Sequence, residues 1–285
     1  MQQFQSISDV RAAIHSAKAK GSRIGLVPTM GNLHEGHLNL VEQAKSGCDY
    51  VVVSIFVNPT QFSAGEDFDQ YPRTLTEDIK HLESQGVDCL FAPSVTEMYP
   101  RQSATQVLLP ELSNILCGLS RPGHFDGVGL VVGKLFNILM PDCAYFGLKD
   151  YQQCLLIQRM VIDLNFPVEI QLCETIREHD GLAKSSRNQY LSELERVQAP
   201  ALYQSLLAVK DALKRGLRQY AEMESEAVAN LTASGFVIDY FHIKNPNSLS
   251  PSEVGDESWQ VIAAAFLGKA RLIDNIAVSA KECVS

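Results

Sequence analysis

Over the first 175 residues, apolar runs rich in β-branched residues alternate with segments of helical periodicity, and this alternation is the strongest constraint on the fold. The strand-like runs are residues 23–28, 50–57, 87–92, 142–147 and 168–173. The helix-like segments are residues 36–45, 74–85, 128–140 and 150–164. Continuous apolar strands separated by helices are typical of a parallel sheet that helices cover on both faces. The sequence therefore predicts an α/β fold with a doubly wound parallel sheet.

The pattern changes after residue 175. Residues 191–216 and 220–234 have the periodicity of helices with charged faces, and residues 236–243, 259–268 and 270–278 resemble short strands. Strands that follow one another without intervening helices favour antiparallel pairing. We therefore expect two domains: residues 1–175, which contain the parallel sheet, and residues 176–285, a second, smaller α+β domain.

Charge and hydropathy exclude several classes of partner. The net charge is −9 and no basic stripe is present, so nucleic acid is not an expected partner. No apolar stretch approaches the roughly 20 residues that span a bilayer. The first 21 residues form an amphipathic helical pattern without the apolar core of a signal peptide. We expect no membrane partner and a cytoplasmic protein.

Seven cysteines are spread singly along the chain, and no two form a C-x-x-C pair. Most lie in apolar runs such as VDCLFAP and PDCAYFG. This distribution favours small buried side chains in a reducing compartment over disulfides or a zinc site.

The turn after the first predicted strand carries His34 and His37 on either side of Gly36. A turn from a strand into a helix presents backbone N–H groups and the positive end of the helix dipole to an anion. Gly31 permits a tight turn and the close approach of a ligand. Two imidazoles on one helical face donate hydrogen bonds to phosphate oxygens, so this stretch predicts a polyphosphate site.

Two alternatives remain for this motif. Zinc proteases place their histidines four residues apart in H-E-x-x-H, whereas HEGH places them three apart, which argues against a metal site. The other alternative is a pair of solvent-exposed histidines on an ordinary helix.

Polar side chains follow two further predicted strands. Asn58 and Gln61 lie just past the second strand, where amides read carboxylates and hydroxyls without adding charge; a plain Asn-Pro turn is the alternative. After the fourth strand, Lys149 supplies a point charge for phosphate. Asp150 either accepts a hydrogen bond from a ribose hydroxyl or caps the next helix, and Gln153 follows one turn later.

A loop after the fifth strand contains Ser185, Ser186 and Arg187, a combination that fits phosphate binding, although serine caps of this kind are common. Arg121 and His124 lie in a Gly/Pro-rich loop between the strands. Each segment is a weak signal alone. Because four of them follow strand ends, their side chains converge on one edge of the predicted sheet, which packing does not explain.

These five segments and a sixth, YPRT, form a recognisable set in their order and spacing: PTMGNLHEGHL, FVNPTQF, YPRT, SRPGHFDGV, FGLKDYQQ and LAKSSRN. Together they closely resemble the pantoate–β-alanine ligase (pantothenate synthetase) family. The resemblance is dense over residues 23–191, and RLIDNIA at residues 271–277 extends it weakly. The H-x-G-H element alone marks a broader nucleotidyltransferase superfamily, whereas FVNPTQF, RPGHF and KDYQQ make the resemblance specific.

This resemblance implies a Rossmann-like N-terminal domain, a C-terminal lid domain and a homodimer. It also implies a two-step reaction in which the carboxylate of (R)-pantoate attacks the α-phosphorus of Mg-ATP and the amine of β-alanine then displaces AMP. The products are pantothenate, AMP and pyrophosphate. ATP is thus a substrate, Mg²⁺ an expected cofactor with unassigned ligands, and pantoate and β-alanine the small-molecule partners.

Position within the matched motifs implies the roles of individual residues. Catalysis falls to His37, His34 and Lys149, with His37 the expected proton donor. ATP binding falls to Met30, Gly31, Asn32, Leu33, His34, Glu35, Gly36, His37, Gly147, Leu148, Lys149, Asp150, Ile176, Lys184, Ser185, Ser186 and Arg187. Substrate binding falls to Gln61, Gln153, Asn58 and Arg121.

Two positions depart from the family pattern. The family commonly has Glu where Leu148 stands and an apolar residue where Lys184 stands. Neither change removes a group assigned to the chemistry, but Lys184 adds a positive charge beside the phosphate loop. Asp67 and Asp69 either touch a metal ion or lie in a solvated loop.

Two rival functions are compatible with parts of the sequence. Another nucleotidyltransferase would share HEGH but would retain a nucleotidyl product. A non-catalytic nucleotide-binding module would have no need of amides such as Gln61 and Gln153.

Overall fold

The computed structural model describes residues 1–63 and 65–280 of the 285-residue chain. The chain divides into two compact units, one formed by Met1–Leu148 with Gln153–Glu174 and the other by Lys149–Gln152 with Thr175–Ser285. A short stretch in the middle of the first unit's sequence thus belongs to the second unit. The boundary predicted between residues 175 and 176 stays a prediction.

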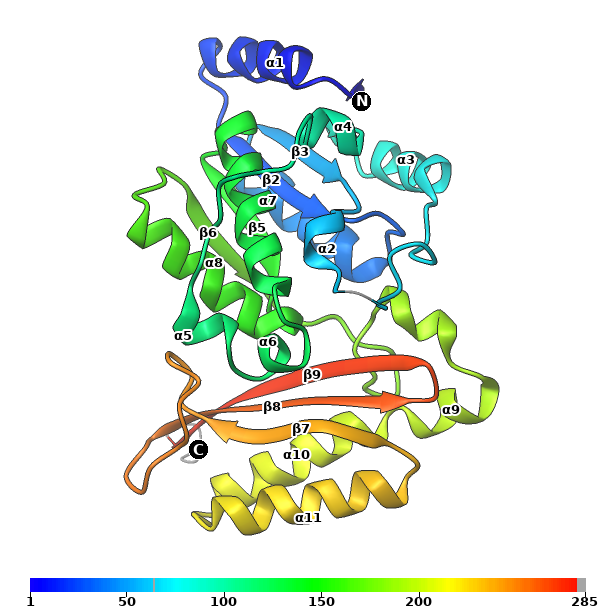
Figure 1. Cartoon of the computed structure of the whole chain (residues 1–285), viewed down its shortest axis with the longest axis vertical. Helices are drawn as coiled ribbons and strands as arrows, with labels where there is room; N and C mark the ends of the chain where they lie inside the picture. The colour runs from blue at the N-terminus through cyan, green and yellow to red at the C-terminus, as the bar shows by residue number, and fades with distance from the viewer. Residues whose placement is uncertain (64, 281–285) are drawn as a thin grey trace. The chain divides into compact units, whose positions relative to one another are not determined.

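The first unit contains a six-stranded sheet with the order β1-β4-β3-β2-β5-β6 (Figure 1). Its strands are β1 (Gln2–Phe4), β2 (Ile24–Thr29), β3 (Tyr50–Ile55), β4 (Cys89–Phe91), β5 (Cys143–Gly147) and β6 (Glu169–Cys173). All of the pairings are parallel. Most positions of β2 to β5 are buried whichever way the side chain points, as their unbroken apolar runs require. The predicted Rossmann-like sheet is confirmed.

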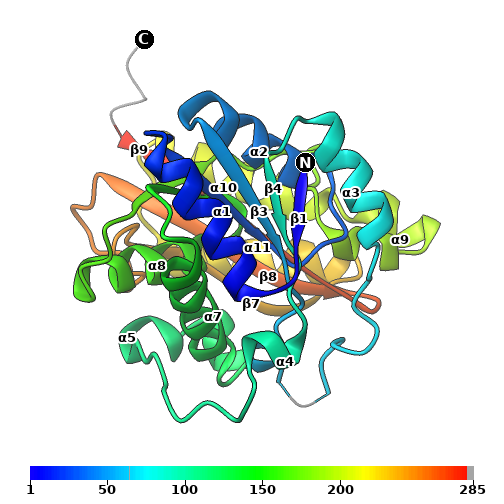
Figure 2. The same ribbon diagram turned by 90° about the horizontal axis from the view of Figure 1, so that it is seen from above.

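Helices lie on both faces of this sheet. Figure 2 shows α1, α7 and α8 on one side and α2 and α3 on the other. The helices are α1 (Ile7–Ala19), α2 (Glu35–Gly47), α3 (Leu75–Ser84), α4 (Val95–Met98), α5 (Pro110–Ser113), α6 (Cys117–Ser120), α7 (His124–Leu139) and α8 (Tyr151–Asp163), with 3₁₀ turns η1 (Pro59–Gln61) and η2 (Leu148–Asp150). The neighbouring strands β2 and β5 send their following helices to opposite faces, and open α/β sheets bind ligands at such a switch point.

The second unit contains an antiparallel sheet with the order β7-β8-β9. Its elements are η3 (Ser186–Tyr190), α9 (Glu193–Gln198), α10 (Ala201–Lys214), α11 (Tyr220–Ala233), β7 (Val237–Lys244), β8 (Ser258–Leu267) and β9 (Ala270–Ser279). Helices α10 and α11 pack on one face of the sheet (Figure 1). The chain's one tryptophan, Trp259, is fully buried in the core between them. The predicted smaller α+β arrangement is confirmed.

Three predicted elements differ from those observed. The first residues form the edge strand β1 before α1 begins, because backbone pairing of Gln2–Phe4 with β4 replaces the helical pattern there. The helix predicted at residues 128–140 begins earlier, at His124, after the left-handed Gly123. The single helix predicted at residues 191–216 is two helices, since Pro200 cannot donate the backbone hydrogen bond that would join α9 to α10.

Within residues 1–63 and 65–280, none of the helices combines the length and hydropathy needed to cross a membrane.

Candidate active site

The turn that follows β2 has a left-handed backbone. Gly31 has φ = 82° and Asn32 has φ = 51°. The N–H of Gly31 donates to Thr29 Oγ1 at 3.1 Å, and a Cβ atom at Gly31 would lie 3.1 Å from both Asp78 Oδ2 and Ile55 Cγ2. Glycine at this position therefore satisfies both the backbone angle and the crowded packing.

A carboxylate buried beneath this turn, Asp78 on α3, holds its backbone. Asp78 is 2% exposed, and its two oxygens accept from the backbone N–H of Asn32 at 3.0 Å and of Leu33 at 2.8 Å. The hydroxyl of Thr74 donates to the same carboxylate at 3.3 Å. Sequence reasoning did not find Asp78, because a carboxylate in the first turn of an amphipathic helix normally faces solvent.

Two histidine rings cap the helix α2. His34 is the N-cap residue, and its Nδ1 accepts from the N–H of Gly36 at 3.1 Å. The Nδ1 of His37 accepts from the N–H of His34 at 3.4 Å. Because Nδ1 is the acceptor in both rings, the neutral form of each ring has its proton on Nε2. The cap thus favours the tautomer that has its N–H on Nε2.

The spacing of the motif brings the two rings together, as predicted. The centroids of His34 and His37 lie 4.1 Å apart with an angle of 39° between the ring planes. A Cβ atom on Gly36 would lie 2.9 Å from Cε1 of His34, so a larger residue would displace that ring. Both rings are half-buried, while Glu35 between them is exposed. The two rings therefore shield each other in part, and their binding of phosphate stays a prediction.

The amide of Gln61 lies against Met30. Its Nε2 donates to Met30 Sδ at 3.2 Å, and its Oε1 accepts from Asn58 Nδ2 at 3.1 Å. Asn58 is 1% exposed, and its Oδ1 accepts from the hydroxyls of Thr60 and Tyr99. Asn58 therefore sets which end of the Gln61 amide is the donor. Asn58 thus does more than form an Asn-Pro turn, because its side chain also orients the amide of Gln61.

Arg121 contacts a carboxylate of the protein in this structure. Its guanidinium donates to both oxygens of Glu66, at 2.8 and 2.7 Å, and lies 3.0 Å from Nε2 of His124. Burial opposes ionisation of Glu66, but the Arg121 guanidinium holds the pKa of that carboxyl below its usual value. The Nδ1 of His124 is 2.7 Å from the backbone oxygen of Gln61. Arg121 and His124 thus support the η1 turn, and a direct substrate contact of Arg121 stays a prediction.

Three more predicted residues of the first unit lie near the end of β5. Gly147 is its last residue, and its carbonyl accepts from Cys154 Sγ at 3.3 Å. Leu148 and Gln153 are half-buried. A Cβ atom on Gly147 would meet nothing within 4 Å, so the backbone there is open to close approach.

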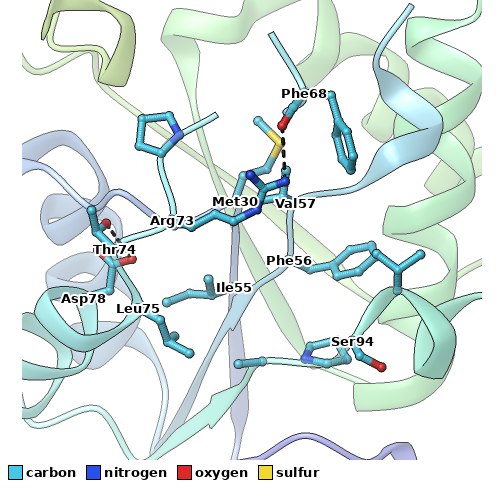
Figure 3. Close-up of a pocket in the computed structure, with 15 residues that line it drawn as sticks. Met30, Ile55, Phe56, Val57, Phe68, Arg73, Thr74, Leu75, Asp78 and Ser94 are labelled. Atoms are coloured by element: carbon cyan, nitrogen blue, oxygen red, sulfur yellow. Dashed lines mark hydrogen bonds between the residues drawn. The ribbon is translucent and has the colours of Figure 1, made fainter. Parts of the chain in front are cut away.

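A pocket of about 280 Å³ adjoins Met30 and Gly31 at the carboxyl ends of β2, β3 and β4 (Figure 3). Figure 3 shows the side chain of Arg73 extending across it toward Phe68. The guanidinium donates to the backbone carbonyls of Phe68 and Asp69 at 3.2 Å each. The arginine of the YPRT segment therefore holds its own loop, a role that the sequence pattern alone did not reveal.

The remaining predicted residues belong to the second unit. Lys149 and Asp150 lie in η2, with Lys149 Nζ 3.7 Å from Asp150 Oδ2. Ile176 accepts a backbone hydrogen bond from Lys184 at 2.9 Å, and the ammonium of Lys184 lies 3.3 Å from Glu178. The charge that departs from the family pattern is thus balanced within its own loop.

The Ser185–Arg187 segment begins the short helix η3. Ser185 is its N-cap and accepts from the N–H of Arg187 at 3.3 Å, so the serine-cap alternative is correct for this hydroxyl. Ser186 and Arg187 are half-buried. Arg177 holds the turn before this segment, because it is bridged to Ala183 and donates to both oxygens of Asp274, at 2.6 and 2.9 Å.

In the described part of the chain, no three His, Cys, Asp or Glu side chains are grouped closely enough to hold a metal ion.

Replacing Asp78 with asparagine is expected to lower the free energy of unfolding by about 1–3 kcal/mol, because an amide cannot accept from both N–H groups of the turn. The KM for ATP should also rise. Thermal unfolding followed by circular dichroism and steady-state kinetics measure the two effects. Glu83→Gln, an exposed carboxylate on the same helix, is the control. Equal behaviour of the two variants would contradict the role of Asp78.

A Rossmann-like sheet whose central strand leads into a histidine-capped helix defines the nucleotide-using enzymes that carry the H-x-G-H element. Within that class, the chain belongs to the pantoate–β-alanine ligase family, whose model matches residues 2–277. This makes the protein an enzyme of the ligase class.

Curated relatives and solved structures agree with this assignment. The chain is 50% identical over 284 residues to a pantothenate synthetase of Pseudomonas entomophila, covering 99% of each chain. It is 51% identical to a pantothenate synthetase of Hahella chejuensis over 95% of this chain and 97% of the relative.

Among solved structures, the pantothenate synthetase of Thermus thermophilus superposes with a TM-score of 0.91 at 46% identity, covering 97% of this chain and 99% of that one. The pantoate–β-alanine ligase of Francisella tularensis, complexed with β-γ ATP and β-alanine, gives a TM-score of 0.82 at 37% identity over 97% of each chain.

Proposed function

We propose that this enzyme condenses (R)-pantoate with β-alanine, using ATP, and that the reaction passes through a pantoyl adenylate. The observation that carries the proposal is the His34–His37 cap, which fixes two Nε2–H donors at the N-terminus of α2. Family membership supports the choice of acid and amine. The ATP and β-alanine in the Francisella structure support the nucleotide and the second substrate.

In the first step, the pantoate carboxylate attacks the α-phosphorus and pyrophosphate leaves. The imidazoles of His34 and His37, with the positive end of α2, stabilise the negative charge that grows on the phosphates. We assign proton donation to His37. These donors are held before the reaction begins, so no reorganisation is needed as the charge develops.

Gln61 and Gln153 hold pantoate in this scheme. Because Asn58 occupies Oε1 of Gln61, the NH₂ group of that amide is the end we assign to the pantoate carboxylate, with β-alanine close to the same residue. Positioning accounts for much of the catalysis, since a bound carboxylate in line with the α-phosphorus replaces a bimolecular encounter.

In the second step, the amine of β-alanine displaces AMP and the amide bond forms. We propose residues 1–175 as the domain that binds ATP and pantoate and residues 176–285 as a lid. The lid would bring Ser185, Ser186 and Arg187 to the phosphates and would exclude water from the adenylate. Lys149 and Asp150 would meet phosphate and ribose, and magnesium would enter with ATP. We further propose a cytoplasmic homodimer.

The reaction is tested with purified enzyme, Mg-ATP, pantoate and β-alanine. We expect exchange of labelled pyrophosphate into ATP that requires pantoate but not β-alanine, and pantothenate with AMP only when both acids are present. A nucleotidyl product that persists would favour another nucleotidyltransferase, and ATP binding without exchange would favour a binding module. Either result would overturn the proposal.

Lys149→Ala is expected to raise the KM for ATP by about tenfold or more while leaving the fold intact, because it removes one charge-assisted contact to phosphate. Pyrophosphate exchange and thermal unfolding measure the two properties. Lys269→Ala, an exposed lysine in the β8–β9 turn of the same unit, is the matched control. Unchanged kinetics in the Lys149 variant would remove this residue from the site.

A further inference from the structure

The RLIDNIA segment lies in β9 and has no part in the chemistry outlined above. Two adjacent residues in it, Asp274 and Asn275, are almost fully buried, at 2% and 7% exposure. Side chains of neighbouring strand residues point to opposite faces of a sheet. Asp274 binds Arg177, whose guanidinium lies 3.7 Å from the ring centre of Tyr203 on α10. Asn275 therefore points to the other face of the sheet.

On that other face, Asn275 reaches the backbone of a predicted catalytic segment. Its Nδ2 donates to the carbonyl oxygen of Lys149 at 2.9 Å. Its own Oδ1 accepts from Nε2 of Gln260 on β8 at 2.6 Å, and Gln260 is 1% exposed. Because Gln260 occupies Oδ1, the Asn275 amide can present only its NH₂ group to Lys149.

A second hydrogen bond fastens the same short segment. The hydroxyl of Tyr151 donates to the carbonyl of Pro246 at 2.8 Å. Residues 149–152 thereby form one compact unit with residues 175–285, although covalently they lie between β5 and the rest of α8. The segment that carries Lys149 is thus fixed to the unit that also carries the Ser185–Arg187 loop.

We propose that Asn275, oriented by Gln260, is a positioning residue that holds the Lys149 turn so that Lys149 reaches the ATP phosphates. The inference depends on the role of Lys149 in the proposed function. Asn275 does not touch substrate; it acts through the Lys149 carbonyl. Asp274 does the equivalent for the turn before the Ser185–Arg187 loop, because it binds Arg177, which is bridged to Ala183. The single strand β9 thus aligns both of the segments that we assign to phosphate binding.

The test uses two variants that lose the amide donor. Asn275→Asp keeps the shape of the side chain but turns an oxygen toward the Lys149 carbonyl, and Asn275→Ser is shorter and neutral, so a charge effect and a donor effect are separable. Both are expected to lower kcat/KM for ATP in pantoate-dependent pyrophosphate exchange by about tenfold, the loss of one well-placed hydrogen bond. The KM for β-alanine should stay within twofold of the parent enzyme.

A double-mutant cycle with Lys149→Ala distinguishes positioning from a general loss of structure. If Asn275 acts through Lys149, Asn275→Ser should have almost no further effect on exchange in the Lys149→Ala background. If the effects of Asn275→Ser and Lys149→Ala on exchange multiply in the double variant, the proposal is wrong. Tyr220→Phe is the stability control, because it removes the hydrogen bond to Trp259 in the same sheet without touching Lys149, and it should leave exchange unchanged.

If the Asn275 variants do not fold, Tyr151→Phe tests the other anchor of the segment and should lower exchange severalfold in the same manner. Normal exchange in the folded anchor variants would overturn the proposal. Absence of pantoate-dependent exchange in the unaltered enzyme would instead overturn the proposed function, so the two failures are distinguishable.

Discussion

Replacing His37 with alanine is expected to lower kcat by about two to three orders of magnitude, the usual loss on removing one preorganised donor to transition-state charge. The ring lies beside that of His34 at the start of α2, and the backbone hydrogen bond that it accepts is long, at 3.4 Å, so the variant should still fold. Pyrophosphate exchange at saturating ATP measures the effect. His15→Ala, an exposed histidine on α1, is the control.

His34→Asn separates the two roles of a capping histidine. Asparagine is among the best N-cap residues, so the helix should keep its cap and its stability. Its side chain is too short to present a donor where Nε2 of His34 lies, so activity should fall while the unfolding temperature stays constant. A variant as active as the parent enzyme would show that His34 is only a cap.

Arg177→Met is expected to lower the free energy of unfolding by about 3–5 kcal/mol at pH 8, because it leaves the carboxylate of Asp274 buried without its partner. The urea transition of this unit can be followed by the fluorescence of the single tryptophan, Trp259, which is buried in the same core. A loss below 1 kcal/mol would contradict the importance of this ion pair.

The destabilisation should depend on pH. Burial raises the pKa of Asp274, and the Arg177 guanidinium opposes that rise. Without Arg177, the folded-state pKa lies further above the unfolded value, so the folded protein binds the extra proton more readily and stability falls as pH rises through that window. The variant should therefore lose less stability at pH 5 than at pH 8. Arg177→Met combined with Asp274→Asn should abolish this dependence on pH.

The strands of both units were predictable because each is a local apolar run, and the edge strand β1 was the exception. Gln2 and Gln3 have no apolar pattern, and only the backbone of β4 recruits them to the sheet. The break between α9 and α10 could have been predicted from the sequence, since Pro200 lies at the start of α10.

The candidate site was predictable where residues follow strand ends in short motifs, as with His34 and His37. The residues that support it were not. The sequence around Asp78, Glu66 and Asn275 contains no distinctive pattern. Tertiary packing alone places them against a backbone turn, a guanidinium and a carbonyl, respectively. A pattern in one segment contains no information about the partner that arrives from another.

Residues Lys149–Gln152 belong to the second unit, although the chain before and after them belongs to the first. This arrangement limits how the enzyme can be divided into fragments or recombined with its homologues. A single cut near residue 175 yields two polypeptides, and neither corresponds to a complete unit. The C-terminal polypeptide lacks residues 149–152, which remain attached to the N-terminal one. Chimaeras between homologues should therefore exchange residues 149–152 together with the C-terminal portion, and grafts made at one junction should mismatch Asn275 with a foreign turn.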